Sequence, residues 1–229
     1  MYRYQYGDGV NSNIQEDFPL RIKIIEPCYR DKRYGLRGLT PSAGPVVIAS
    51  LLKKNGHDVE VISEYVTEFD LDDVENADLI GISITTYNAT RGYDIAGQID
   101  KPIVFGGFHA SLMPEESLEH GDYVIRGDGF SLVQLVEYLQ GNSDIQLREI
   151  PNLVYRDNGQ IVSNSVASQV VNIVPDYSLV KDYFKLNVNR LLRIPLLVNA
   201  SRGCTFNCSF CSIKSIWSDF VKKDVAVVI

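Results

Sequence analysis

The stretch "PSAGPVVIASLLKKNGHDVEVIS", residues 41–63, joins a helix pattern directly to a strand pattern. Apolar residues recur at helical spacing over 41–56, with a proline near the start and Gly56 suited to end the helix. Residues 57–63 then alternate β-branched and polar side chains, which is typical of a strand. A helix that leads straight into a strand is half of a βαβ unit, so this stretch predicts an α/β fold.

The same alternation continues on both sides of this stretch. It predicts a flavodoxin- or Rossmann-like parallel sheet of five strands in the order 2-1-3-4-5, covered by helices on both faces. In such sheets, ligands bind at the carboxyl ends of the strands, where the loops here are rich in Gly, Ser and Thr. The expected strands are 21–27, 57–63, 77–86, 101–109 and 122–129, and the expected helices are 41–56, 90–99, 113–121 and 131–141.

The composition is that of an ordinary globular protein, with 45% hydrophobic and 22% charged residues in a chain of 229. The net charge is -7 and no long basic run occurs, so we expect no nucleic-acid partner. The polar start lacks the apolar part of a signal peptide, and no apolar run is long enough to span a membrane. These features favour a cytoplasmic location, where clustered cysteines are more often metal ligands or redox groups than disulfides.

Beyond residue 141 the pattern changes. Two β runs around "DNG" over 150–164 predict a hairpin, and residues 194–204 predict a new strand that leads directly into a cysteine cluster. We therefore expect four parts. They are an extension over 1–20, the α/β domain over 21–141, a hairpin and linker over 142–193, and a final segment over 194–229.

Three of the four cysteines, Cys204, Cys208 and Cys211, fall within eight residues of that final segment. Thiolates bind iron–sulfur clusters and zinc, and these spacings let one loop surround a compact cluster. Three thiolates leave one iron of a cubane open, whereas structural zinc requires four protein ligands. No histidine or fourth cysteine lies nearby, because Cys28 belongs to the loop after the first strand. The count of three favours an open-iron cluster, with a zinc knuckle or incidental cysteines as the alternatives.

The CxxxCxxC motif, with Phe210 before its third cysteine and "SRGC" leading into it, resembles the radical S-adenosylmethionine (radical SAM) superfamily. The resemblance implies a 4Fe–4S cluster on Cys204, Cys208 and Cys211 whose open iron chelates S-adenosylmethionine, with Phe210 beside that cofactor. It also implies cleavage to a 5′-deoxyadenosyl radical, and hence an external electron donor similar to flavodoxin or ferredoxin. In the superfamily this motif follows the first strand of a barrel, so residues 194–229 are expected to be the start of a truncated radical SAM barrel.

The preceding domain resembles the cobalamin-binding domain of cobalamin-dependent radical SAM enzymes. The resemblance rests on "GPVVIASLLKKNGHDVEVIS", "ADLIGISITT", "IVFGGFHASLMPEESLEHGDYVIRGDG" and "NLVYRDNGQIV", in this order. The loop "EPCYRDKRYG" contains no histidine, so we expect no histidine ligand on cobalt. The family's "RGEGE" stands here as "RGDGF", which keeps a carboxylate at Asp128 but loses one at Phe130. The cobalamin contacts implied by the resemblance are Thr40, Ser42, Ser83, Thr85, Gly106, Gly107, His109, Gly127 and Asp128.

The resemblance implies an enzyme with a small-molecule substrate, and methyl transfer to an unactivated carbon or phosphorus centre is the favoured reaction. The alternatives are a radical SAM oxidoreductase or cyclase of the same family, a cobalamin-binding module without catalysis, and a structural domain that binds zinc. The chain ends on the apolar run "VAVVI" with no helix-ending signal. We therefore expect a shortened chain that lacks most of the substrate pocket and is inactive by itself, and we assign no catalytic residue.

Overall fold

In the computed structural model, the described residues are 18–28, 40–141, 144–169, 172–185 and 196–228. The expected extension over 1–20 therefore lies almost wholly outside the described residues. Within the described ranges, no helix is both long enough and apolar enough to cross a membrane.

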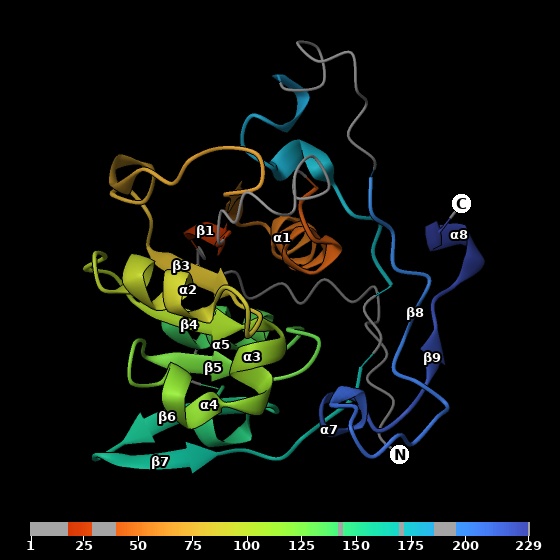
Figure 1. Cartoon of the computed structure of the whole chain (residues 1–229). Helices are drawn as coiled ribbons and strands as arrows, with labels where there is room; N and C mark the ends of the chain where they lie inside the picture. The colour runs from red at the N-terminus through yellow and green to blue at the C-terminus, as the bar shows by residue number, and fades with distance from the viewer. Residues whose placement is uncertain (1–17, 29–39, 142–143, 170–171, 186–195, 229) are drawn as a thin grey trace.

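Five parallel strands form the main part of the sheet, in the order β2-β1-β3-β4-β5 that the sequence predicted (Figure 1). Because parallel neighbours run in the same direction, the carboxyl ends of all five strands lie at one edge of the sheet. That edge is where the Gly-, Ser- and Thr-rich loops come together. The strands are β1 (Arg21–Glu26), β2 (Asp58–Ser63), β3 (Leu79–Ser83), β4 (Ile103–Gly106) and β5 (Tyr123–Ile125).

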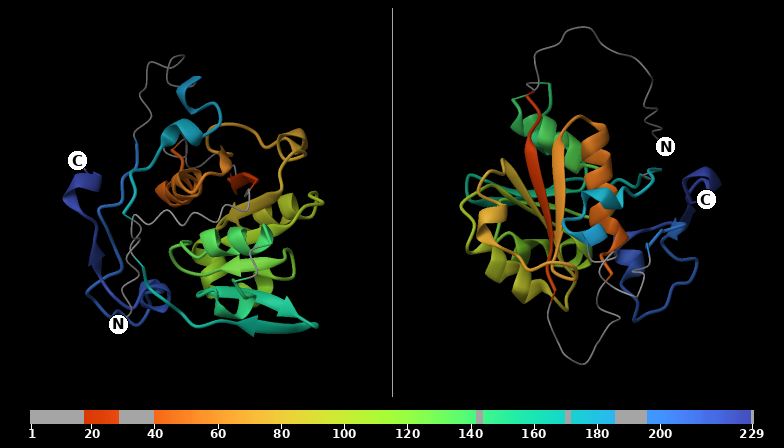
Figure 2. Two further views of the ribbon diagram at one scale, coloured as in Figure 1. Left: turned by 180° about the vertical axis from the view of Figure 1, so that it is seen from behind. Right: turned by 90° about the horizontal axis from the view of Figure 1, so that it is seen from above.

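Helices cover both faces of the sheet, as a parallel sheet requires (Figure 2). Helices α1 and α5 lie on one face, and α2, α3 and α4 lie on the other. The C-terminal segment, blue in Figure 2, lies on the same side of the sheet as α1. The helices are α1 (Ala43–Lys54), α2 (Ala89–Ala96), α3 (Gly107–Leu112), α4 (Pro114–Ser117) and α5 (Leu132–Leu139), with 3-10 turns at Leu71–Asp73, Leu147–Glu149 and Tyr177–Leu179.

Side chains that alternate along each strand divide the core into two halves. Ile24 and Val104 face α1 and α5, whereas Ile25 and Phe105, one residue further along, face α2 and α3. Burying one such side chain contributes about 1.5–3 kcal/mol, so burial on both faces is the main stabilising term of the domain. It also explains why the strands appear in the sequence as almost continuous apolar runs.

The predicted hairpin extends this sheet. β6 (Leu153–Asp157) pairs antiparallel with β5, and β7 (Gln160–Ser163) pairs with β6, which makes a sheet of seven strands. Asn158 and Gly159 have φ angles of 48° and 80°, the left-handed conformations that a tight hairpin turn requires. The hairpin therefore shares one sheet with the domain that precedes it.

The C-terminal segment contains only short elements. β8 (Ser201–Arg202) pairs antiparallel with β9 (Val221–Lys222), and α7 (Ile213–Ile216) and α8 (Val225–Val228) have four residues each. Within the described residues, the strand expected over 194–204 is thus reduced to β8. Leu196 and Val198 before it are 57% and 46% exposed, because no other described strand pairs with this part of the chain and covers it.

Glu26, the last residue of β1, is a buried carboxylate that joins three elements. Its oxygens accept hydrogen bonds from the backbone N–H of Ser42, just before α1, at 3.0 Å and from the hydroxyl of Ser63, at the end of β2, at 2.6 Å. Burial raises the pKa of Glu26 above its ordinary value, although both hydrogen bonds oppose the rise. The carboxylate therefore fixes the start of α1 at the carboxyl edge of the sheet, at an energetic cost whenever it is ionised.

This cost predicts that Glu26→Gln gains stability relative to the wild type as the pH rises. The folded protein holds its proton above the ordinary pKa of 4.5, so the wild type loses stability between that pH and the raised folded-state pKa, by at most about 1.4 kcal/mol per pH unit. Urea unfolding of both proteins from pH 4 to pH 8 measures the difference. Glu75→Gln, at an exposed position, is the control and should show no such trend. A constant difference between Glu26→Gln and the wild type would contradict the prediction.

Candidate functional site

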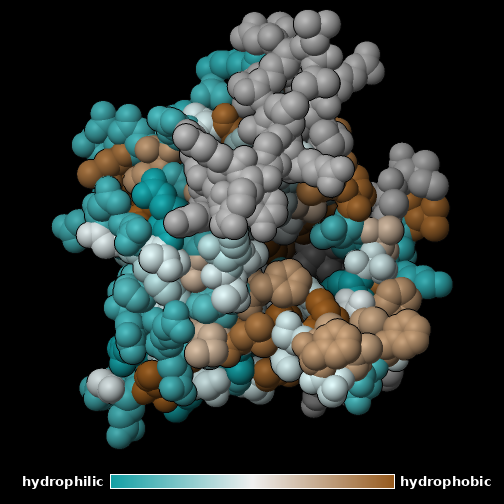
Figure 3. Space-filling model, viewed as in Figure 1, coloured by the Kyte–Doolittle hydropathy of each residue, from teal (hydrophilic) through white to brown (hydrophobic). Residues whose placement is uncertain are grey.

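A cavity of about 590 Å³ lies at the carboxyl edge of the sheet, between α1 and the C-terminal segment. Ile24 and Val104 on the strands and Val47 and Ile48 on α1 give it an apolar side. Apolar side chains, brown and tan in Figure 3, also gather on the surface at the lower right, where α3 and α7 lie in Figure 1. The C-terminal segment lines the opposite side of the cavity with Leu197, Asn199, Ser201, Arg202, Gly203, Ile213, Ile216, Trp217 and Lys223.

Glycines keep the sheet side of the cavity open. At Gly44, in the first turn of α1, no atom lies within 4 Å of the position that a Cβ would occupy. Gly107 has a φ of 89°, and a Cβ there would lie 2.6 Å from the backbone oxygen of Ile84. Gly127 and Gly129, with φ angles of 74° and 77°, shape the turn after β5. Backbone rather than side chains therefore borders much of the cavity, which lets a ligand approach the strand ends closely.

Most of the predicted cobalamin contacts line this cavity, although they come from the ends of three strands, β3, β4 and β5, and from the start of α1. Two do not: Thr40 precedes α1 and is not part of the lining, and His109 belongs to another cluster. The convergence follows from the parallel sheet, which brings all these loops to one edge. The predicted residues that line the cavity are Ser42, Ser83, Thr85, Gly106, Gly107, Gly127 and Asp128.

His109 lies in a buried polar cluster between α2, α3 and α4. Its Nδ1 is 3.2 Å from Thr86 Oγ1, and its Nε2 is 3.2 Å from Glu116 Oε1. The hydroxyl of Tyr93 donates to the same Glu116 oxygen at 3.2 Å, and the Tyr93 ring stacks on His120 with centroids 4.0 Å apart. Both ring nitrogens of His109 are thus engaged within the protein, and none of the described residues that line the cavity is a histidine.

Asp128 connects the α/β domain to the C-terminal segment. Its Oδ1 accepts a hydrogen bond from Trp217 Nε1 at 2.7 Å, and its Oδ2 forms an ion pair with Arg202 Nη1 at 2.5 Å. Burial raises the pKa of Asp128, and the Arg202 cation opposes that rise. Burial is also the main cause that lowers the pKa of nearby Lys223. The cavity wall therefore contains one carboxylate and two cationic side chains, all partly withdrawn from water.

The three clustered cysteines lie, in sequence, between two residues that line the cavity. Cys204 is half-buried, Cys208 and Cys211 are exposed, and Phe210 between them is 91% exposed. Gly203, just before the stretch, and Ile213, two residues after it, both line the cavity. Among the described residues, no three His, Cys, Asp or Glu side chains are grouped in a way that would hold a metal ion. The fit to a cluster thus rests on donor chemistry, since three thiols stand on one exposed stretch at the family spacing.

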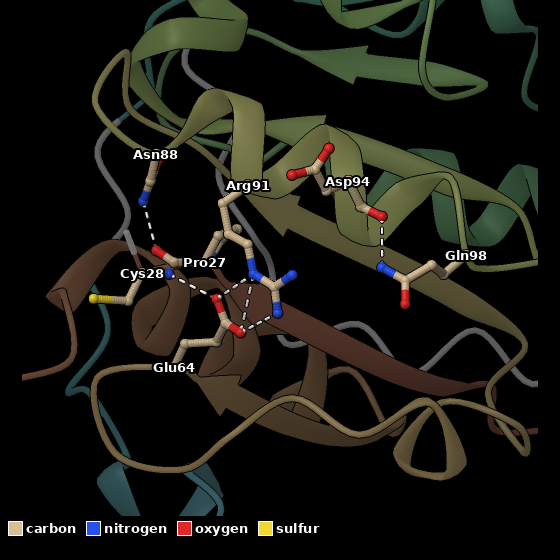
Figure 4. A network of polar contacts seen from close by, with 7 residues as sticks. All are labelled: Pro27, Cys28, Glu64, Asn88, Arg91, Asp94 and Gln98. Atoms are coloured by element: carbon tan, nitrogen blue, oxygen red, sulfur yellow. Dashed lines mark hydrogen bonds and ion pairs between the residues drawn. The ribbon is translucent and has the colours of Figure 1, made fainter. Parts of the chain in front are cut away.

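Cys28 lies apart from the other cysteines, in a polar network at the ends of β1, β2 and β3 (Figure 4). Glu64 accepts hydrogen bonds from the Cys28 backbone N–H at 2.9 Å and from Arg91 Nη2 at 2.6 Å. Asn88 donates to the Pro27 carbonyl at 2.6 Å. These contacts fasten the ends of the three strands to α2, which holds the loops at the cavity edge in place.

Several residues of the site were not identified from the sequence. Arg202 and Trp217 were visible only as parts of "SRGC" and "SIKSIW", which flank the cysteines, and Lys223 carried no signal. Glu64 and Arg91 lie in loops and helices with no motif of their own. Each acquires its role through a contact with a residue distant in sequence, and periodicity cannot reveal such contacts.

Comparison with known proteins shows what the α/β domain is similar to. Residues 36–136 match the B12 binding domain family. The anaerobic magnesium-protoporphyrin IX monomethyl ester cyclase of Cereibacter sphaeroides is 28% identical over 232 aligned residues, which cover 92% of this chain and 37% of the relative. An uncharacterized methyltransferase of Pyrococcus horikoshii is 30% identical over 215 residues, covering 84% of this chain and 45% of the relative. The chain thus spans less than half the length of these relatives.

Two solved structures share the fold. The cobalamin-dependent S-adenosylmethionine radical enzyme OxsB, with aqua-cobalamin and S-adenosylmethionine bound, has a TM-score of 0.71 and 19% identity, covering 93% of this chain and 31% of OxsB. The radical S-adenosylmethionine methyltransferase TsrM from Kitasatospora setae, with cobalamin and a [4Fe-4S] cluster bound, has a TM-score of 0.66 and 18% identity, covering 92% of this chain and 44% of TsrM. The resemblance to cobalamin-dependent radical SAM enzymes is therefore confirmed, and the expected α/β fold with it.

The site geometry predicts that Gly203→Ala distorts the C-terminal segment near Trp217, because Gly203 and Asp219 approach each other closely within it. A Cβ at this position would lie 2.0 Å from the Asp219 carbonyl oxygen, and the φ of 74° already disfavours a side chain. Gly141→Ala is the matched control, because its φ is 90° but no atom lies within 4 Å. Both variants carry about 1 kcal/mol of backbone strain, and only Gly203→Ala adds the steric clash.

Emission from Trp217, the single tryptophan of the chain, measures this distortion. We expect a red shift for Gly203→Ala and an unchanged spectrum for Gly141→Ala. Identical spectra from both variants would mean that the close approach of Gly203 to Asp219 does not hold the segment.

Proposed function

We propose that the chain is the cofactor-binding part of a cobalamin-dependent radical SAM enzyme that transfers a methyl group to a small-molecule substrate. The proposal rests on the lining of the cavity. One side comes from the domain that matches the B12 binding family, and the other side comes from the segment that bears the CxxxCxxC motif. The similarity to a methyltransferase of Pyrococcus horikoshii and to the methyltransferase TsrM supports this reaction.

In this proposal, the cavity takes the part of cobalamin that reaches below the loops. A whole corrinoid is larger than the cavity, so its nucleotide tail would enter between α1 and the strand ends while the corrin ring lies at the mouth. The apolar side of the cavity suits a flat base, and the glycine turns allow backbone N–H groups to approach it. Ser42, Ser83 and Thr85 would offer hydroxyl groups along the same path.

The cysteine stretch would hold the second cofactor. Cys204, Cys208 and Cys211 supply three thiolates for a 4Fe–4S cluster, and exposed Phe210 would contact S-adenosylmethionine on the open iron. When bound, the cluster and S-adenosylmethionine would supply radical chemistry and cobalamin would carry the methyl group. The protein residues would orient the two cofactors toward each other across the cavity.

The remaining parts of the proposal concern the larger protein. Residues 194–229 would begin the radical SAM barrel after a hairpin and linker over 142–193, and the chain alone would not turn over. A reduced cluster requires a low-potential electron donor, which we infer to be similar to flavodoxin or ferredoxin in the cytoplasm. No residue of this chain is assigned a catalytic step.

A second candidate reaction is the oxidative ring closure of a cyclase. It is favoured by the 28% identity to the magnesium-protoporphyrin IX monomethyl ester cyclase, which spans 92% of this chain. Because this chain alone would not turn over, S-adenosylmethionine with a labelled methyl group distinguishes the two reactions in the larger protein, reconstituted with its cofactors. Label that appears on bound cobalamin favours methyl transfer, and release of 5′-deoxyadenosine without that label favours the cyclase.

We expect Gly44→Leu to prevent cobalamin binding while Gly44→Ala permits it. Both side chains would project into open space at the start of α1, so neither should unfold the domain, but only leucine fills the cavity. Alanine should in addition raise stability by about 0.5–1 kcal/mol, because glycine is a poor helix residue. Retention of hydroxocobalamin on gel filtration, followed by its visible absorbance, tests both variants. Full retention by Gly44→Leu would contradict binding in this cavity.

A variant with Cys204, Cys208 and Cys211 all replaced by alanine should lose the cluster but keep cobalamin. After anaerobic reconstitution with iron and sulfide, the wild type should gain the broad visible absorbance of a thiolate-bound cluster, which dithionite bleaches. Cys28→Ser is the control and should keep this absorbance, because Cys28 lies in the network around Glu64. Bound zinc in the wild type without this absorbance would overturn the radical SAM assignment.

A further inference from the structure

We propose that Asp128 is a positioning residue that fastens the cysteine-bearing segment to the wall of the cavity by holding it on both sides of the cysteines. This role differs from the direct cobalamin contact that the sequence predicted for Asp128. It concerns contacts within the chain alone, so it goes beyond the proposed function and does not depend on it.

The two partners of Asp128 bracket the cysteine stretch. Arg202, two residues before Cys204, forms the ion pair with Oδ2 at 2.5 Å. Trp217, six residues after Cys211, donates its indole N–H to Oδ1 at 2.7 Å. The Asp128 carboxylate thus closes a loop that contains all three clustered cysteines. Both carboxylate oxygens contact the C-terminal segment.

The contact is shielded from water, which makes it strong and selective. The side chains of Arg202 and Asp128 are only 11% and 13% exposed. Removing one member of a buried ion pair leaves the other charge uncompensated, which is far more costly than losing an exposed pair. The charge on Asp128 is therefore expected to keep the segment docked, although exposed Phe210 and Leu197 on that segment gain little burial themselves.

Surrounding contacts give the carboxylate a fixed position. Asp128 lies between Gly127 and Gly129, whose positive φ angles turn the chain sharply after β5. The N–H of Gly127 donates to Ser111 Oγ at 2.9 Å, which ties the turn to α3. The ring of Phe108, also on α3, meets the Trp217 ring edge-on with centroids 5.3 Å apart. The α/β domain thus holds the Asp128 carboxylate and the Phe108 ring side by side, and the segment contacts them through Trp217 and Arg202.

The consequence is that Asp128 determines where the cysteines lie relative to the cavity. Gly203 and Ile213, which line the cavity, lie within the loop that Asp128 closes. If the carboxylate is removed, the segment loses one polar contact at each end of this loop. The cysteine stretch then moves away from the cavity, which opens on that side.

The fluorescence of Trp217 tests the proposal directly in the protein without cofactors, because the chain contains a single tryptophan. For Asp128→Ala we expect a red-shifted emission and a rise of roughly twofold in acrylamide quenching, as for a locally released segment. Asp128→Asn keeps an oxygen for Trp217 but loses the charge, so it should give a smaller change. Asp128→Glu restores the carboxylate and should return the signal toward that of the wild type.

Asp219→Asn is the matched control. Asp219 lies on the same segment, is exposed, and accepts a hydrogen bond only from the neighbouring Ser218 hydroxyl among the contacts described, at 2.8 Å. The Asp219→Asn substitution removes one negative charge without changing a contact of Arg202 or Trp217. We therefore expect the emission and quenching of the wild type. Arg202→Gln breaks the ion pair from the segment side and should reproduce the Asp128→Ala signal, which covers the case in which Asp128→Ala does not fold.

Two results would overturn the proposal. The first is wild-type emission and quenching in folded Asp128→Ala or in Arg202→Gln. The second is loss of hydroxocobalamin retention in Asp128→Ala with no change in Trp217, which would make Asp128 a cofactor contact. Failure of the wild type to retain cobalamin would count against the proposed function alone, since the fluorescence is measured without it.

Discussion

Parallel pairing of the five central strands is the constraint on which the rest of the structure depends. It requires apolar cover on both faces, which α1 and α5 provide on one side and α2, α3 and α4 on the other. It also brings every loop that follows a strand to one edge. The cavity at that edge is therefore a product of topology, and its residues come from separate loops that the parallel strands bring together.

Three carboxylates at this edge stabilise its geometry. Glu26 ends β1 and holds the start of α1, Glu64 follows β2 and binds Arg91 of α2, and Asp128 follows β5 and holds the C-terminal segment. Each carboxylate is buried or nearly so, and each accepts a hydrogen bond from a group outside its own strand. Burial makes these contacts costly to break, so they fix loops that apolar packing leaves unsupported.

The strands and the hairpin turn followed from the sequence because they depend on local patterns, and the strand order followed from the fold class that these strands indicate. Almost continuous apolar runs identify strands buried on both faces, and Asn158 and Gly159 adopt the positive φ angles that "DNG" implies. The role of Asp128 did not follow, because its partners Arg202 and Trp217 are distant in sequence and belong to the other wall of the cavity. His109 stood in a promising loop, but the turn into α3 directs its ring toward Glu116. Long-range polar contacts leave no periodic trace in a sequence.

Because the α/β domain and the C-terminal segment both line the cavity, ligand binding in the cavity is coupled to docking of the segment. A ligand that contacts both walls binds the docked arrangement more tightly than the open one, and by linkage it stabilises docking by the same free energy. Docking of the segment through Asp128 must in turn raise the affinity of such a ligand. Since Gly203 and Ile213 belong to the wall and flank the cysteines, occupancy of the cavity and the position of the cysteine stretch become one equilibrium. The chain thus links the cavity and the cysteine stretch through a single buried carboxylate.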